Sequence, residues 1–183
     1  DVERSRGLGD VYKRQLVNNA GIMVINAFED ESDAMSDAQI DINLRGVING
    51  CKVGVEIMHE RGGQIVNVAS LAGVIPLPGS AVYCATKFAV RGLTLSLREE
   101  YRDSGISFST VMPSKVRTEL AAGSEKAGRG IPTADPEDVA NAVVDAVKKD
   151  LAEVTVPRYL RGVPAALAAA PSRAERLFRR VLD

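Results

Sequence analysis

Short apolar runs recur along the chain, separated by longer stretches in which apolar residues return every three or four positions. A short apolar run bounded by turn-forming residues is typical of a buried strand. On this pattern we predict four strands, at Leu16-Val17, 64–70, 106–112 and 153–157.

The longer periodic stretches predict three helices. The first begins at Ser36, which forms a capping-box pair with Gln39, and it runs to about His59. The second covers 81–102 and is apolar around much of its circumference, so we expect it to pack on more than one side. The third follows the capping residue Asp135, a proline and two acidic residues. Because strands alternate with helices, we expect a parallel α/β architecture.

The two ends of the chain depart from this pattern. Residues 1–15 are polar and lack a helical or strand period, so we expect a disordered or non-native leader. Residues 16–157 form the α/β domain. The segment 158–183 has six arginines and no lysine, and residues 172–183 are amphipathic. We expect this C-terminal extension to dock as a helix on the domain or on a sister subunit; the alternative is contact with anionic lipid or a partner.

Composition narrows the class of protein. A length of 183 residues fits one domain. With 23 basic and 24 acidic residues the net charge is −1, and no bulk attraction to nucleic acid follows. Two cysteines, Cys51 and Cys84, are expected to be reduced thiols of a cytoplasmic protein. No apolar run reaches the roughly 20 residues of a membrane span, and the single histidine, His59, makes no metal site.

Tyr83 and Lys87 are the first candidates for chemistry. Their spacing of four residues places them on one face of the second predicted helix. An ammonium beside a phenol favours the phenolate and lowers the phenol pKa from its reference value of about 10. A phenol adjusted in this way can exchange a proton with an alcohol or carbonyl near neutral pH.

Other polar residues follow predicted strands. Ser70 ends the strand 64–70, and ligand sites of parallel sheets lie at the carboxyl ends of the strands. The turn Asn18-Asn19-Ala20-Gly21 follows the first strand and suits close approach of a ligand to the backbone. Asn43 lies inside the first helix, where asparagine is unfavourable, and it could hold a water for proton relay.

Taken together, these motifs resemble the short-chain dehydrogenases/reductases. The resemblance covers Leu16 to about Pro157 and includes the twelve residues that separate Ser70 from Tyr83 in this sequence. The motifs that carry it are Asn18-Asn19-Ala20-Gly21, Asn43-x-x-Gly46, Ser70, Tyr83-x3-Lys87 and Pro113…Thr118.

The resemblance implies a role for each residue. Tyr83 would be the general acid/base, and Lys87 would lower its pKa and bind the nicotinamide ribose. Ser70 would orient the substrate carbonyl, and Asn43 would hold the relay water. The implied activity is hydride transfer between NAD or NADP and an alcohol or carbonyl substrate. The residues implied to bind the cofactor are Asn18, Ala20 and Gly21 on the adenosine-ribose side, Tyr83 and Lys87 at the nicotinamide ribose, and Pro113, Val116 and Thr118 at the carboxamide.

The sequence departs from the family at two places. Ser114 follows Pro113 where the family usually has glycine. The family's Gly-rich T-G-x3-G-x-G turn and its first strands are not found before Asn18, so we expect a partial Rossmann-type, doubly wound parallel sheet. We therefore expect a fragment that binds NAD(P)H poorly and turns over little, with an exposed sheet edge at Leu16.

The family resemblance also implies a homodimer or homotetramer that packs through the two long helices. Two other functions stay open. One is a non-catalytic binding or regulatory protein on the same scaffold, against which the complete set of catalytic residues argues. The other is a membrane-surface protein that uses the basic C-terminal helix. The sequence does not indicate the substrate, the direction of reaction or the choice between NAD and NADP.

Overall fold

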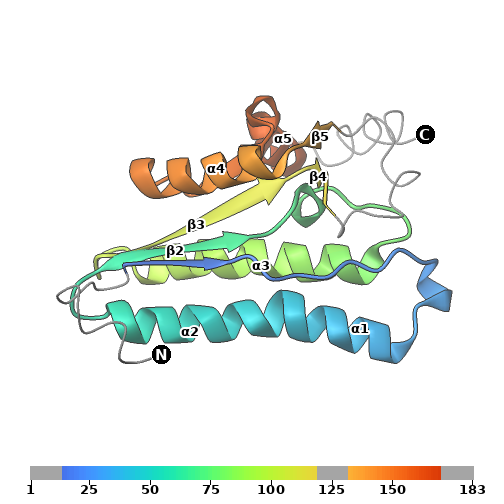
Figure 1. Cartoon of the computed structure of the whole chain (residues 1–183), viewed down its shortest axis with the longest axis horizontal. Coiled ribbons are helices and arrows are strands. Elements are labelled where there is room, and N and C mark those ends of the chain that lie inside the picture. Colours follow the sequence, from blue (N-terminus) through green and yellow to red (C-terminus); the bar gives the residue numbers. More distant parts are fainter. Residues whose placement is uncertain (1–13, 119–131, 170–183) are drawn as a thin grey trace.

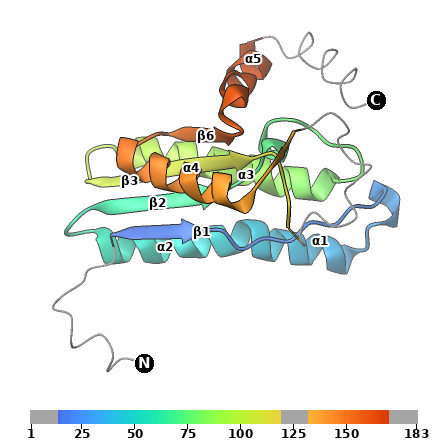
Figure 2. The ribbon, with the colours of Figure 1, turned by 45° about the horizontal axis from the view of Figure 1, so that its top comes forward.

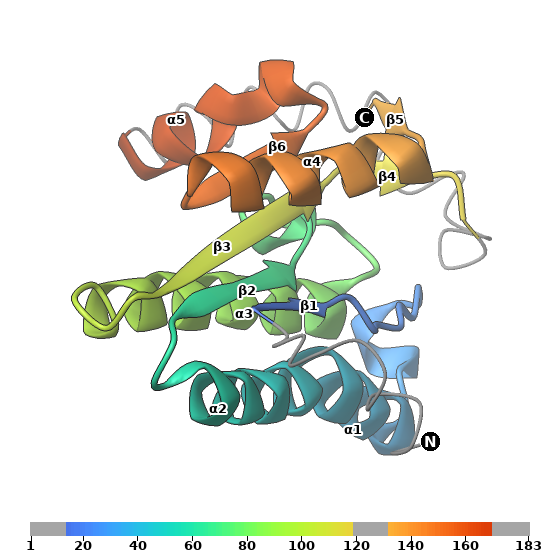
Figure 3. The same cartoon turned by 60° about the vertical axis from the view of Figure 1, so that its left-hand side comes forward.

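The computed structural model describes residues 14–118 and 132–169. These residues form three layers, with a parallel sheet between two layers of helices (Figure 1). Helices α2 and α3 cover one face of the sheet, α4 covers the other, and α1 continues the line of α2 beyond the carboxyl ends of the strands (Figure 3). The parallel α/β architecture predicted from the alternation of strands and helices is therefore confirmed, as is the doubly wound, Rossmann-type sheet that the family resemblance implies.

The main sheet has four parallel strands in the order β1-β2-β3-β6. They are β1 (Gln15–Asn18), β2 (Gly63–Val68), β3 (Ile106–Pro113) and β6 (Glu153–Val156). All four predicted strands are confirmed to within two residues. A second, two-stranded parallel sheet of β4 (Lys115–Val116) and β5 (Thr133–Ala134) was not predicted, because two residues carry no periodic signal.

The first helix is one continuous rod with an irregular middle. It consists of α1 (Asp33–Ile40), a π-helical segment (Asp41–Arg45) and α2 (Gly46–Met58). Its N-cap is Ser32, four residues before the predicted cap Ser36. The prediction of a Ser36–Gln39 capping box is therefore wrong: Ser36 Oγ instead donates to Glu31 Oε1 at 2.9 Å.

The other two predicted helices are confirmed as α3 (Ala81–Glu100) and α4 (Pro136–Lys149). Asp135 and Asp138 form a capping box at the start of α4. The structure adds 3₁₀ turns at Phe28–Asp30, Leu71–Gly73 and Arg158–Gly162, and a short helix α5 (Val163–Ala169).

Both faces of the sheet are buried, as is typical of parallel sheets. Adjacent residues of β2 divide between the two sides: Ile65 packs with Phe108 against α2 and α3, whereas Val66 packs with Val111 against α4. All four of these side chains are fully buried. The sheet is therefore a rigid base on which the loops at its carboxyl edge are held.

The strand β1 lies at one edge of the described sheet, and Val17 is 43% exposed there. The strand includes Gln15, and the carbonyl of Arg14 accepts a hydrogen bond from Gln64 N–H at 2.8 Å. The strand β1 thus begins one residue before the predicted boundary at residue 16. The rest of the predicted leader, residues 1–13, lies outside the described residues.

The described part of the C-terminal extension consists of the 3₁₀ turn after β6 and α5, which extends away from the sheet (Figure 2). The predicted amphipathic helix 172–183 lies outside the described residues. Among the helices that the structure describes, none has the length and apolar character needed to cross a membrane.

Candidate active site

A cavity of about 860 Å³ opens at the carboxyl ends of β1, β2 and β3. The residues that follow each strand line it, together with the start of α3 and one face of α4. This is the edge of a parallel sheet at which ligands bind in doubly wound folds. The predicted residues Ser70, Tyr83 and Lys87 all line this cavity.

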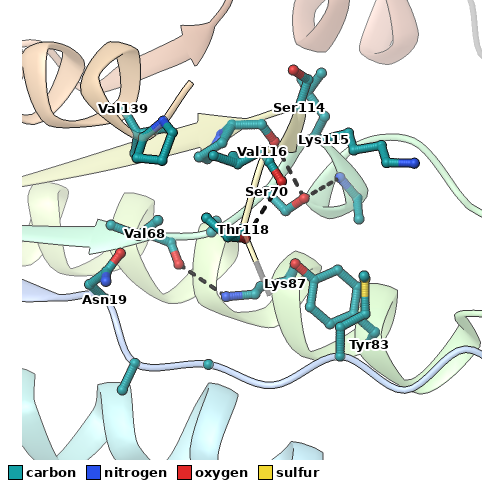
Figure 4. A pocket seen from close by; sticks show the side chains of 18 of the residues that line it. Asn19, Val68, Ser70, Tyr83, Lys87, Ser114, Lys115, Val116, Thr118 and Val139 are labelled. Atoms are coloured by element: carbon teal, nitrogen blue, oxygen red, sulfur yellow. Dashed lines mark hydrogen bonds between the residues drawn. The ribbon is translucent and has the colours of Figure 1, made fainter. Parts of the chain in front are cut away.

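Two elements bring these three side chains together. Ser70 follows the end of β2, and Tyr83 and Lys87 lie one turn apart on α3. In Figure 4 their side chains point toward the same space. Lys87 Nζ donates a hydrogen bond to the carbonyl of Val68 at 3.1 Å and lies 5.7 Å from the centre of the Tyr83 ring. The carbonyl of Val68, the last residue of β2, thus holds the ammonium beside the phenol.

The hydroxyl of Ser70 is held by the backbone around it. Its Oγ accepts a hydrogen bond from Ala72 N–H at 3.1 Å and lies 3.4 Å from the carbonyl oxygen of Pro113, to which it can donate. A hydrogen bond from Ser70 also favours the ionised form of Tyr83 and so opposes the rise in the phenol pKa. The serine hydroxyl therefore lies next to the phenol in the cavity.

Burial dominates the electrostatics of the pair. It raises the pKa of Tyr83 above its usual value of 10.0, and the hydrogen bond from Ser70 only partly offsets that rise. Burial also lowers the pKa of Lys87 from 10.5 to about 8. Desolvation of the phenolate is thus the largest influence on the Tyr83 pKa in this structure, and a lowering of that pKa by Lys87 stays a prediction.

Asn43 lies in the π-helical segment and is fully buried. Its Oδ1 accepts from Ile22 N–H at 2.8 Å, and its Nδ2 donates to Ile22 O at 2.8 Å and to Thr86 Oγ1 at 3.3 Å. The amide is thus engaged with the backbone after Gly21. Both amide protons are used in these bonds, whereas Oδ1 keeps a second lone pair, so the role in holding a relay water stays a prediction.

The comparison with protein families decides the identity of the chain. A family model described as short chain dehydrogenase matches residues 14–128. The chain belongs to this family. The resemblance predicted from the sequence motifs is therefore confirmed.

Similar curated proteins are oxidoreductases. Oxidoreductase UcpA of Escherichia coli (strain K12) is 40% identical over 134 residues, which are 72% of this chain and 50% of that protein. Probable oxidoreductase EphD of Mycobacterium tuberculosis (strain ATCC 25618 / H37Rv) is 33% identical over 168 residues, which are 81% of this chain and 28% of that protein. This short-chain dehydrogenase thus spans half the length, or less, of these relatives.

Solved structures share the fold. A short chain dehydrogenase from Burkholderia cenocepacia J2315, in complex with NADP, superposes with a TM-score of 0.79 at 23% identity, over 100% of this chain and 75% of that one. A 4-hydroxyisoleucine dehydrogenase complexed with NADH superposes with a TM-score of 0.68 at 25% identity, over 83% of this chain and 70% of that one. The Rossmann-type fold is therefore established.

The predicted cofactor-binding residues of this short-chain dehydrogenase divide into two groups. Most of them line the cavity: Ala20, Gly21, Tyr83, Lys87, Pro113, Val116 and Thr118. Asn18 does not, because its amide turns into the interior and donates to Asn67 Oδ1 at 2.8 Å. Its neighbour Asn19 lines the cavity instead. Side chains alternate along extended chain, so one of the two had to face inward, but the sequence does not indicate which.

Gly21 leaves space next to the ammonium of Lys87. A Cβ on Gly21 would lie 3.5 Å from Lys87 Nζ and 3.2 Å from Asn43 Oδ1. A side chain at this position would therefore fill the part of the cavity that adjoins the ammonium. The absence of a side chain keeps that donor accessible to a ligand hydroxyl.

Sequence reasoning missed two walls of the cavity. One is the face of α4 that carries Val139 and Val143, which follow each other at helical spacing. The other is the extended chain after Gly21, which contributes Met23 and Ile25. The alternation of apolar residues at Met23 and Ile25 indicates an extended segment with one apolar face. It was missed because the segment follows β1 and does not itself belong to the sheet.

Proposed function

We propose that this short-chain dehydrogenase transfers hydride between the nicotinamide of NAD or NADP and the carbon of an alcohol/carbonyl pair, with Tyr83 as general acid/base. The observation that carries the proposal is the convergence of Ser70, Tyr83 and Lys87 in one cavity. These residues supply a proton donor, a second hydroxyl and a cation within a largely buried space.

The residues present fit a nicotinamide ribose. Lys87 Nζ offers donors beyond its bond to Val68 O, and the missing side chain of Gly21 leaves room beside it. Val116 and Thr118 lie in the same cavity and would contact the carboxamide. The bound nicotinamide supplies the hydride donor or acceptor, which no amino-acid side chain provides.

The chain's own residues then manage one proton. In the reduction direction, Tyr83 donates its hydroxyl proton to the carbonyl oxygen of the substrate, and in the oxidation direction the phenolate takes the proton of the alcohol. Ser70 donates a hydrogen bond to the same substrate oxygen and so stabilises the charge that develops there. Lys87 stabilises the phenolate while its ammonium is protonated, and this opposes the effect of burial on Tyr83.

The first experiment measures cofactor binding to the purified 183-residue chain. Lys87 and Tyr83 contact the nicotinamide ribose in this proposal, and the sequence contains no Gly-rich turn of the family type for the pyrophosphate. We therefore expect reduced nicotinamide mononucleotide to bind within about tenfold of NADH, a difference of about 1.4 kcal/mol. A much tighter NADH complex would show that the chain holds the whole dinucleotide.

The second experiment tests the role of Tyr83. We expect slow turnover of a methyl ketone at high protein concentration, followed by the loss of reduced-nicotinamide absorbance. Tyr83→Phe should lower that rate by about 10²–10⁴-fold, the usual contribution of a general acid. Tyr159→Phe is the matched control, since Tyr159 is 72% exposed on the turn after β6. Equal rates for wild type and Tyr83→Phe would contradict the assignment and favour a binding protein.

We also propose that the chain self-associates through the helical layer of α2 and α3. Val53 and Ile57 on α2 are 52% and 63% exposed, and Phe88 on α3 is 43% exposed. Large apolar side chains gathered on neighbouring helices are typical of an interface between subunits. A dimer or tetramer of this kind has a symmetric contact, in which the same helices meet their copies.

A further inference from the structure

We propose that Gln39 is a positioning residue for the substrate, because it fixes the extended segment 21–26 that forms one wall of the cavity. We call residues 21–26 the wall segment. The proposal rests on the proposed function, since it takes the Tyr83 hydroxyl as the place where the substrate reacts. It deepens that function by naming a substrate class, an alcohol or ketone with a hydrocarbon body.

The wall segment is tied to the first helix by two side-chain amides one turn apart. Asn43 binds both the N–H and the carbonyl of Ile22, each at 2.8 Å. Gln39 Oε1 accepts a hydrogen bond from Val24 N–H at 3.1 Å. The helix therefore supplies the hydrogen-bond partners that a neighbouring strand would supply in a sheet.

A third tie crosses to the opposite side of the cavity mouth. Asn26 N–H donates to the carbonyl of Gly79 at 3.0 Å, in the loop that leads into α3. The residues 22, 24 and 26 are thus all held through their backbone. A segment tied at every second residue cannot slip by one position without losing all three contacts.

The residues between the ties face the cavity. Gly21, Met23 and Ile25 line it, as the alternation of side chains along extended chain requires. Met23 packs against the cluster of Ala72, Tyr83 and Cys84. The position of the wall segment therefore sets how far the Met23 side chain stands from the reacting phenol.

Gln39 has a fixed orientation in this arrangement. It is fully buried, and its Nε2 donates to Glu31 Oε1 at 2.7 Å. Because the carboxylate accepts only, Nε2 must face Glu31, and Oε1 must then face Val24 N–H. The same carboxylate oxygen also accepts from Ser36 Oγ, which holds Glu31 in place. The interior position of a polar side chain in α1 is explained by these two bonds.

The substrate class follows from the chemistry of the wall. On the side of Tyr83, the cavity is lined by Met23 and Ile25 and, from the chain after β2, by Leu71, Ile75 and Leu77. In the described part of the cavity the lining includes no carboxylate and no arginine. A hydrocarbon chain is the group that gains most free energy from such a surface.

The test uses the full 183-residue chain and two readouts that need neither cofactor nor turnover. The first is the hydrogen-exchange rate of the Val24 amide by NMR. The second is the binding of straight-chain methyl ketones, followed by the Met23 methyl signal. In Gln39→Met, which keeps the side-chain length but loses both hydrogen bonds, we expect Val24 to exchange about tenfold faster, as loss of one hydrogen bond implies. Long ketones should bind several-fold more weakly, whereas butan-2-one should be unaffected.

Two further variants separate positioning from folding. Ser36→Ala removes the other donor to Glu31 but leaves the bond to Val24, so both readouts should match wild type. In the double variant Glu31→Gln/Gln39→Glu, the new amide at position 31 can donate to the new carboxylate at position 39. That carboxylate can still accept from Val24 N–H. The double variant should therefore recover slow hydrogen exchange at Val24 and the binding of long ketones. Wild-type exchange at Val24 in Gln39→Met, or equal weakening of short and long ketones, would overturn the proposal.

Failure of the positioning role and failure of the proposed reaction give different results. If nicotinamide mononucleotide does not bind, or if Tyr83→Phe turns over at the wild-type rate, the proposed function fails while the readouts on Val24 and Met23 keep their meaning. If these readouts do not respond to Gln39, the positioning role fails while hydride transfer can still be measured.

Discussion

Lys87 places an ammonium where a neutral side chain would be more stable. The residue is 5% exposed, and burial lowers its pKa from 10.5 to about 8. A lowered pKa of a cationic group means that the folded state binds its proton less tightly than the unfolded state. At 1.36 kcal/mol per pKa unit, the protonated group costs the folded chain roughly 3 kcal/mol below pH 8.

The residue-scale prediction concerns the stability of Lys87→Met. At pH 7 the Lys87 ammonium is charged in both the folded and the unfolded state, so removing it should raise the free energy of unfolding. Loss of the hydrogen bond to Val68 O should offset about 1 kcal/mol of that gain. Between pH 8 and 10.5 the wild type sheds the proton in its folded state first, so its stability rises with pH and the advantage of the variant shrinks.

Urea unfolding at pH 7 and pH 10 measures the effect. Lys52→Met is the matched control, since Lys52 lies exposed on α2 and should change stability little at either pH. If Lys87→Met is less stable than wild type at pH 7, the buried ammonium does not destabilise the folded state and the prediction is wrong. A variant that is more stable and inactive would agree with a residue kept for the reaction rather than for the fold.

Single residues also show how far sequence reasoning reaches. Ser70, Tyr83 and Lys87 were found because helical spacing and the carboxyl edge of a strand fix where such side chains lie. Asn18 was placed in the cavity although its amide faces the interior. A turn after a strand does not indicate which of two neighbouring side chains faces a ligand, since that depends on how the strand sits in the sheet.

At the scale of the element, the site depends on how closely the 3₁₀ turn Leu71–Gly73 approaches α3. A Cβ on Gly73 would lie 2.8 Å from the backbone carbonyl oxygen of Lys87 and 3.1 Å from its carbon. Backbone atoms in the middle of a helix cannot give way as a side-chain end can. The turn that carries Ser70 at its N-cap and the helix that carries Tyr83 therefore meet only because residue 73 lacks a side chain.

The element-scale prediction compares two glycines. Gly73→Ala should destabilise the chain by about 1–3 kcal/mol, as overpacking of a buried contact usually does. Gly92→Ala should instead stabilise it by about 0.5–1 kcal/mol, because no atom lies within 4 Å of a Cβ there and alanine is the better helix former. Thermal unfolding of both variants measures the difference. Equal effects of the two substitutions would contradict the close approach.

Element boundaries were predictable where the chain has a strong local signal. The capping residue Asp135 with Pro136 after it gave the start of α4, and the apolar run of β3 gave the extent of that strand. The cap of α1 was placed four residues late, because Ser32 and Ser36 are both acceptable caps. Only the fold shows that the side chains of Ser36 and Gln39 donate hydrogen bonds to Glu31 instead.

At the scale of the whole molecule, two exposed surfaces can bind another copy of the chain. One is the outer edge of β1, where Val17 is 43% exposed. The other is the apolar surface of α2, where Val53 is 52% exposed. An open strand edge invites pairing with another chain, whereas an apolar helix face favours a defined subunit contact.

The whole-molecule prediction is that both surfaces contribute to association, in different ways. Val17→Lys should suppress large, irregular species, because a charge on an edge strand discourages strand pairing. Val53→Lys should instead convert a discrete dimer or tetramer to the 19.5 kDa monomer. Sedimentation velocity at several protein concentrations separates the two effects. A wild-type chain that stays monomeric at all concentrations would contradict both.

The number of residues in the π-helical segment Asp41–Arg45 decides which side of the helix the flanking residues face. The buried residues Gln39, Asn43, Val47 and Cys51 follow at intervals of four, and the 12 residues from first to last would make about 3.3 turns of a regular α-helix. The wider turn absorbs the surplus and keeps all four on one side. Inserting one further residue here would leave every anchor in the sequence but rotate Gln39 by about 100° away from Val24. The length of this segment therefore constrains the chain as strictly as the identity of any residue in it.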